Sequence, residues 1–197
     1  MGTVAIQHAP TEREWQPSKG VIGMTGLIIA ESAIFTIFVV AYLYYVGHDT
    51  SGPKPKDVLE IPWFYSICLI SSSFFIVLAE HAIEHGRMLA FRLWWLVTMA
   101  LGITFLYGTA MEWKKLIVED HLTVSTNLFG TTFYSLVGLH ASHVIAGLLM
   151  MMVVAVFALT GAVTQKHAER VKVLALYWHF VDAVWIVVFT VVYWIGR

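Results

Sequence analysis

Five long runs of apolar residues, separated by short polar links, dominate the pattern along this chain. A helix needs about 20 apolar residues to cross the core of a bilayer, and each run meets or nearly meets that length. A β-barrel would instead alternate apolar and polar residues in segments of about ten. The pattern therefore predicts an all-α fold, a polytopic membrane bundle of five transmembrane helices. The runs cover approximately residues 21–46, 61–79, 93–111, 128–160 and 173–195.

The links between the runs hold the turn-forming and charged residues, at 52–55, 86–87, 119–121 and 164–170. Links this short favour antiparallel packing of consecutive helices. The sequence contains no internal repeat or low-complexity tract. We therefore expect one five-helix domain, residues 20–197. We expect a cytoplasmic N-terminal segment before it, residues 1–19, which lacks the apolar core of a secretory signal.

The composition is that of an integral membrane protein. The chain is 58% hydrophobic and 13% charged, whereas a soluble domain has about 25% charged residues. The net charge of −1 gives no electrostatic basis for binding nucleic acid. The single cysteine, Cys68, excludes an intrachain disulfide and a multi-cysteine metal or iron–sulfur site.

The lysines and arginines bias the orientation of the bundle. With five spans, the N-terminus and the second and fourth links share one side, which carries seven of these residues against five on the other. The excess predicts a cytoplasmic N-terminus and an outside C-terminus. The seven are Arg13, Lys19, Arg87, Arg92, Lys166, Arg170 and Lys172, and the five are Lys54, Lys56, Lys114, Lys115 and Arg197.

The fifth run carries two ionisable residues near its middle, His179 and Asp182. A charged group at mid-bilayer costs about 2.5–3.5 kcal/mol on insertion scales, so such residues usually face a protein interior and are functional. A spacing of three places both on one helix face. Trp178, Asp182 and Trp185 follow one helical stripe, which indicates helix packing. A functional site and a polar pair that holds helices together are both consistent with the spacing.

The fourth run combines small residues with two more histidines. Gly138, Ser142 and Ala146 form a stripe at intervals of four, and such stripes allow helix backbones to approach closely. His140 and His143 lie in the same helix. We therefore expect helix packing at the small residues and buried polar contacts at the histidines.

Two groups of histidines are compatible with metal binding by their spacing. The histidines of the fourth run are too close on one helix to be both axial ligands of a heme, although His143 with His179 would be compatible with one. His81, Glu84 and His85 match the short inverzincin pattern, which suggests an intramembrane metalloenzyme as an alternative. Hydrogen bonds between helices, and a solvated polar helix end followed by the link at 86–87, explain the two groups without a metal. We expect no metal, no cofactor and no catalytic residue in this chain.

Glu31 is the only charged residue of the first run. An isolated carboxyl group at that depth can donate a hydrogen bond to a neighbouring helix when protonated, and it can also exchange protons. A structural role and a proton pathway remain open. A free-standing proton transporter built on Glu31 is a further alternative, although the inverted repeats and broken helices of transporters are not seen in the sequence.

Several motifs together resemble subunit III of the heme-copper respiratory oxidases, in the bacterial five-helix form of cytochrome c oxidase subunit III. The sequence YWHFVD at 177–182, followed by Val184 and Trp185, resembles the C-terminal signature of that family. GLHASHV at 138–144, AES at 30–32 and Glu112-Trp113 resemble other family segments in the right order. Seven-helix relatives have two more N-terminal helices that enclose a lipid-filled cleft. This chain resembles the family from its third helix onward, so such lipid binding would need a partner subunit.

The resemblance implies a non-redox, non-catalytic subunit of a terminal oxidase complex. Such a complex reduces oxygen to water during aerobic respiration and couples electron transport to proton translocation. In this family the hemes and copper belong to subunit I. The chain would contact subunit I directly, and subunit II, further respiratory subunits and membrane lipids, including phospholipid, would be its other partners. The bacterial cell (inner) membrane is the expected location.

The expected role is support of the stability of subunit I and of proton uptake. An accessory subunit of a quinol oxidase or of a nitric oxide reductase is the nearest alternative. We expect one buried polar network in which the fifth-run pair reaches the fourth helix and the first-run carboxyl lies near subunit I. Its members are Glu31, His140, His143, His179 and Asp182.

Overall fold

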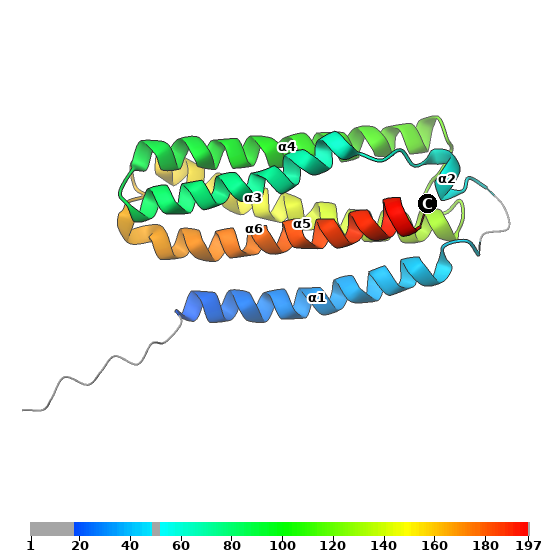
Figure 1. Ribbon diagram of the computed structural model, residues 1–197, viewed down its shortest axis with the longest axis horizontal. Coiled ribbons are helices and arrows are strands. Elements are labelled where there is room, and N and C mark those ends of the chain that lie inside the picture. The colour runs from blue at the N-terminus through cyan, green and yellow to red at the C-terminus, as the bar shows by residue number, and fades with distance from the viewer. Residues whose placement is uncertain (1–17, 49–51, 197) are drawn as a thin grey trace, which may run out of the picture.

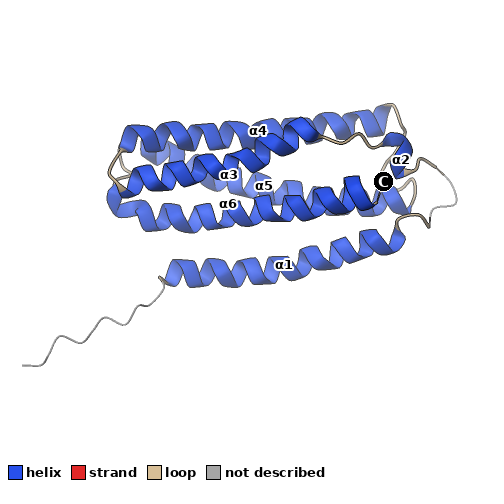
Figure 2. Cartoon of the chain, in the orientation of Figure 1, coloured by secondary structure: helices blue, strands red, loops and turns tan. Residues whose placement is uncertain are grey.

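The computed structural model describes residues 18–48 and 52–196 and is almost entirely helical. In this part of the chain no strand is present (Figure 2). Five helices are long and apolar enough to cross a membrane, which confirms the predicted fold class. The helical segments are α1 (Lys19–Tyr45), α2 (Pro55–Val58), α3 (Trp63–Glu84), α4 (Met88–Val118), α5 (Leu128–Leu159), η1 (Gln165–His167), α6 (Ala168–Phe189) and the π-helical turn η2 (Thr190–Ile195).

Local signals start and separate these helices. The Ser18 side chain accepts a hydrogen bond from the Val21 backbone at the start of α1, and Asn127 does the same for Gly130 at the start of α5. Both are polar N-cap residues that satisfy free backbone N–H groups. Gly86, with a φ of 70°, makes the tight turn between α3 and α4. Consecutive long helices run antiparallel (Figure 1).

The helices α3, α4, α5 and α6 form a compact block, and α1 lies along one side of it (Figure 1). α3 and α4 are the most extensively paired helices, while α1 packs mainly against α5 and α6. Only Phe35 and Tyr42 are buried among the 27 residues of α1. The block therefore has its own core, and α1 is attached to it along one narrow stripe.

Close contacts inside the block depend on glycines that face one tryptophan. Trp178 of α6 is fully buried, and its ring lies against the backbone of Gly102 on α4 and Gly147 on α5. A Cβ atom at either glycine would come within 2.9 Å of the ring. Since real Cβ atoms do not approach that closely, these positions accept only glycine without rearrangement. The indole thus fills the centre of the α4–α5–α6 contact.

Candidate functional site

A hydrogen-bonded acid–imidazole pair joins α1 to α5. Glu31 Oε2 lies 3.2 Å from His143 Nε2, and the side chains are 24% and 14% exposed, respectively. Phe35 packs against the imidazole ring at a centroid distance of 4.9 Å. The Tyr177 hydroxyl of α6 donates to the His143 backbone carbonyl at 3.1 Å. The pair therefore lies where three helices meet.

The second nitrogen of His143 limits how the pair can be protonated. Its Nδ1 lies 2.8 Å from the Leu139 carbonyl oxygen, which can only accept a hydrogen bond, so Nδ1 must be the donor. Nε2 and the carboxyl of Glu31 then share one proton. Either a neutral acid donates to a neutral imidazole, or an imidazolium donates to a carboxylate. Both arrangements have no net charge, so the pair can hold a proton in an apolar environment without a net buried charge.

A serine bridges the two ionisable residues of the last span. Ser73 of α3 donates a short hydrogen bond from its hydroxyl to Asp182 Oδ2. The Ser73 hydroxyl oxygen also lies 3.0 Å from His179 Nδ1. Because the single hydroxyl proton is directed at the carboxylate, the imidazole N–H donates to the serine oxygen. Asp182 is only 4% exposed, and its Oδ1 has no hydrogen-bond partner in the described part of the chain.

Two indole groups extend the same α3–α6 contact. Trp178 Nε1 donates to Ser72 Oγ at 2.8 Å, and Trp185 Nε1 donates to Ser66 Oγ at 3.1 Å. Both tryptophans are buried. In these two contacts α3 supplies the hydroxyl acceptors and α6 supplies the indole donors.

His140 lies apart from these hydrogen bonds. It is fully buried, and neither ring nitrogen has a hydrogen-bond partner among residues 18–48 and 52–196. Its ring stacks on Trp185 at a centroid distance of 4.9 Å and meets the edge of Phe105 at 5.8 Å. It thus fills the position of an aromatic core residue.

The five predicted network residues are therefore divided in space. Glu31 is hydrogen-bonded to His143, and His179 is connected to Asp182 through the serine bridge. The bridge lies on α3, the second span, whereas we had expected contact with the fourth. His140 belongs to neither group. A single connected network is not formed by the hydrogen bonds within the described chain.

The histidine patterns do not form a metal site in the described part of the chain. In the described ranges no group of three or more histidine, cysteine, aspartate or glutamate side chains is arranged to hold a metal ion. His81 and His85 stack at a centroid distance of 4.1 Å on the exposed end of α3, and His85 Nδ1 donates to the His81 carbonyl. This geometry is that of a solvated helix end.

Comparison with known proteins identifies the family. The family model described as cytochrome c oxidase subunit III matches residues 18–197. The chain belongs to this family. It is 33% identical to cytochrome c oxidase subunit 3 of Alkalihalophilus pseudofirmus, over 89% of this chain and 86% of the relative. It is 32% identical to the same subunit of Thermostichus vulcanus, over 98% and 94%.

A subunit of a quinol-oxidising enzyme is equally similar. The chain is 35% identical to cytochrome bo(3) ubiquinol oxidase subunit 3 of Pseudomonas aeruginosa, over 89% of this chain and 85% of the relative. Cytochrome c and quinol oxidases thus both contain relatives of this chain. The family resemblance inferred from the motifs is confirmed, and the chain is a membrane-embedded subunit III of the heme-copper oxidases, which function as multi-subunit oxidoreductases.

The small-residue stripe on α5 is placed differently from the glycines that pack the core. Gly138 is half-buried near Trp113, while Ser142 and Ala146 lie on the exposed face of α5. The Ser142 hydroxyl donates to a carbonyl of its own helix. Within this chain, the close approach on α5 is made by Gly147. Helix packing at Ser142 and Ala146 stays a prediction, because these exposed residues could be packed only by a neighbouring subunit.

Sequence reasoning missed two polar partners. Ser73 had only an indirect signal, because three consecutive serines interrupt the second span at 71–73 but do not show which of them faces the last span. The contact between Tyr193 and Glu112 had a weaker signal, because both lie near span ends where polar residues are common. The Tyr193 hydroxyl lies 2.8 and 2.9 Å from the two carboxylate oxygens of Glu112 and donates to that carboxylate.

Proposed function

We propose that this chain is a non-catalytic subunit of a heme-copper terminal oxidase that packs directly against subunit I and stabilises it during turnover. The observation that carries the proposal is the exposure of α1. Only two of its residues are buried, although it carries Glu31, which is paired with His143 of α5. A helix with a half-buried acid and a largely unpacked apolar surface is explained by a second membrane protein covering it.

The chemistry of the oxidase is assigned to other subunits. We expect the hemes and copper in subunit I, with subunit II as a further partner. Two features support the absence of a redox centre here. Cys68 is the only cysteine, and His140 is enclosed by aromatic rings. We expect this chain to support proton uptake by the oxidase and to take no part in the oxygen chemistry.

The proton-related role is assigned to the pair on α1 and α5. Glu31 and His143 share one proton without net charge, and both are partly exposed on the surface of this chain. The orientation with a cytoplasmic N-terminus and an outside C-terminus, in the bacterial cell membrane, rests on the distribution of lysine and arginine. Glu31 lies near the middle of α1, so the pair would lie deep in the bilayer.

The proposal is tested by isolating the tagged chain in mild detergent and recording a reduced-minus-oxidised optical spectrum. Heme bands together with large co-purifying membrane subunits are expected. A colourless protein without partners would contradict the proposal and favour a free-standing transporter. Cross-linking from residues on the exposed face of α1, such as Ile29 and Ile37, should capture subunit I.

A carbodiimide experiment tests the assignment of Glu31. The Glu31→Gln variant should assemble normally, because glutamine can still hydrogen-bond to His143, and it should lose labelling by an apolar carbodiimide. Glu84→Gln is the matched control, since Glu84 is an exposed carboxylate at the end of α3. Unchanged labelling of the Glu31→Gln complex would refute the assignment.

A quinol oxidase is the second candidate. The Pseudomonas relative, a ubiquinol oxidase subunit, is as similar to this chain as the cytochrome c oxidase subunits are. The purified complex should therefore be assayed with reduced cytochrome c and with a quinol in parallel. Turnover of cytochrome c alone would assign a cytochrome c oxidase, and turnover of quinol alone would assign a quinol oxidase.

A further inference from the structure

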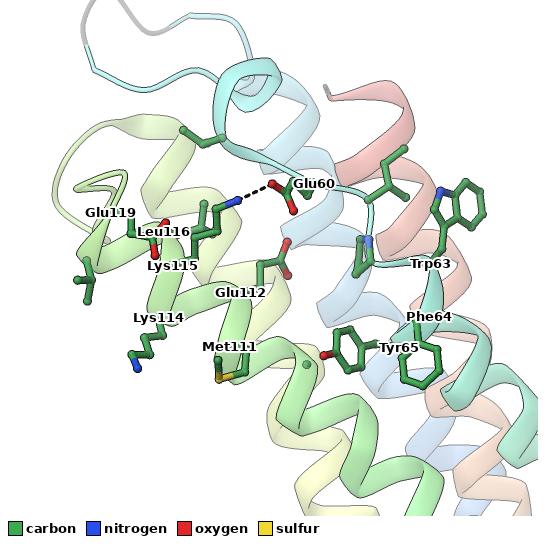
Figure 3. Close-up of a pocket in the computed structure, with 15 residues that line it drawn as sticks. Glu60, Trp63, Phe64, Tyr65, Met111, Glu112, Lys114, Lys115, Leu116 and Glu119 are labelled. Atoms are coloured by element: carbon green, nitrogen blue, oxygen red, sulfur yellow. Dashed lines mark hydrogen bonds and ion pairs between the residues drawn. The ribbon is translucent and has the colours of Figure 1, made fainter.

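A cavity of about 580 Å³ opens where the α2–α3 link meets the end of α4 (Figure 3). Its position follows from the helix bounds. Trp63 begins α3 and Val118 ends α4, so the cavity lies at the ends of two membrane spans. At that depth the headgroup and the upper part of a lipid chain meet the protein. Neither the Glu31–His143 pair nor the Ser73 bridge lines it.

The walls of the cavity are of two kinds. Trp63, Phe64 and Met111 are apolar side chains on the open part of the wall, each at least 40% exposed. Tyr65 packs against Gly108 of α4, where a Cβ atom would overlap the ring, so this glycine lets the ring lie flat against α4. Aromatic rings and apolar chains therefore face the side from which a lipid would enter.

Carboxylates dominate the polar wall. Lys115 is paired with Glu60 at 2.5 Å, and Glu112 faces the space between this pair and Tyr65 (Figure 3). Among the described residues, the hydrogen bonds to the Glu112 carboxylate come from the Tyr193 hydroxyl, although a carboxylate can accept about four hydrogen bonds. Lys114 also lines the cavity, but Figure 3 shows its side chain directed away from Glu60 and Glu112.

We propose that this cavity binds a phospholipid whose headgroup ends in a primary ammonium, such as phosphatidylethanolamine. The ammonium has three donors, which match the remaining acceptor positions of Glu112. The ring of Tyr65 offers an aromatic face to the same cation. The acyl chains leave over Phe64 and Met111.

The charge of the wall selects among headgroups. A choline headgroup carries the same charge but has no N–H donor for the carboxylate. A purely anionic headgroup would face an excess of carboxylates, because the lining residues Glu60, Glu112 and Glu119 outnumber Lys114 and Lys115. The inference concerns this chain alone and does not depend on which oxidase it assembles with.

The test uses the membrane complex that contains the full chain, placed in nanodiscs with equal parts of phosphatidylethanolamine, phosphatidylcholine and phosphatidylglycerol. Native mass spectrometry measures the lipids that stay bound. Preferential retention of phosphatidylethanolamine is expected, and Glu112→Gln should weaken it about tenfold, the effect of losing a hydrogen bond to a charged group. Glu84→Gln removes the same charge at the other end of the bundle and should leave retention unchanged.

A measurement on the unmodified protein keeps the proposal testable if the variant does not assemble. A photoactivatable phosphatidylethanolamine should label the segments 60–65 and 108–119, and unlabelled phosphatidylethanolamine should compete better than phosphatidylcholine. Equal retention of the three lipids, labelling confined to other segments, or a quinone or a protein segment found in the cavity would each overturn the assignment.

Discussion

The hydroxyl of Ser73 should be one of the most important side-chain groups between α3 and α6. It accepts a hydrogen bond from His179 and donates one to Asp182. Ser73→Ala removes this one oxygen atom and therefore both interhelical hydrogen bonds. The methyl group left behind cannot replace either contact. The carboxylate of Asp182 is almost completely buried and already has one unpartnered oxygen. After the substitution, neither oxygen of Asp182 would have a donor among residues 18–48 and 52–196.

The size of the effect follows from these two hydrogen bonds. Interhelical hydrogen bonds in membrane proteins contribute about 0.6 kcal/mol on average and up to about 1.7 kcal/mol. Two of them give about 1–3 kcal/mol, and the upper part of this range applies because Asp182 keeps its burial while losing its donor. Since 1.4 kcal/mol is about a tenfold change in an equilibrium constant, the equilibrium constant for unfolding should rise by roughly one to two orders of magnitude.

The assay is reversible unfolding in mixed detergent micelles, followed by the fluorescence of the buried tryptophans. Ser71→Ala is the matched control, because it removes a hydroxyl two residues away on the same helix. A double-mutant cycle of Ser73→Ala with Asp182→Asn isolates the pairwise energy. Equal unfolding free energies for the Ser73 and Ser71 variants, or additive effects in the cycle, would refute the proposed bridge.

Three further substitutions test other parts of the fold in the same unfolding assay. Gly147→Ala should destabilise by about 1–3 kcal/mol through overpacking against Trp178, and an unchanged midpoint would contradict that packing. Tyr193→Phe removes the donor to Glu112 but keeps the ring, so a loss of about 1 kcal/mol is expected; an unchanged stability would show that the ring alone matters. His140→Phe should be neutral or stabilising, because the imidazole has no hydrogen-bond partner in the described chain and lies among aromatic rings; a large loss of stability would reveal a polar contact there.

The number and order of the spans could be read from the sequence because the bilayer sets a minimum apolar length. The ends were less accurate where charged residues occur within a helix. The third span was predicted at 93–111, whereas α4 covers Met88–Val118 and includes Arg92, Lys114 and Lys115. Hydropathy reports which residues contact lipid, but a helix continues into the aqueous phase as long as its backbone hydrogen bonds do. The fourth span, without charged ends, was predicted to within one residue of α5.

The ionisable residues of the site could also be found from the sequence, because each is costly in an apolar span. Their partners could not. Spacing along α6 places His179 and Asp182 on one face, but it does not say which helix that face meets. The answer, α3, depends on how the bundle is rotated around α6, and Ser73 becomes visible only when the serines at 66 and 72 are seen to accept from Trp185 and Trp178.

The two small-residue faces of α5 show why helix rotation is difficult to predict in a membrane protein. In water, the buried face of a helix is apolar and the exposed face is polar, so periodicity identifies both. In a bilayer both faces are apolar, and that signal is lost. Ser142 and Ala146 form a regular stripe yet lie on the exposed face, whereas Gly147, one position further, contacts Trp178 in the core. What separates the two faces is the large partner, a buried indole with a hydroxyl acceptor on α3. For helices of this kind, a tryptophan opposite a glycine is therefore a better guide to the buried face than the spacing of small residues alone.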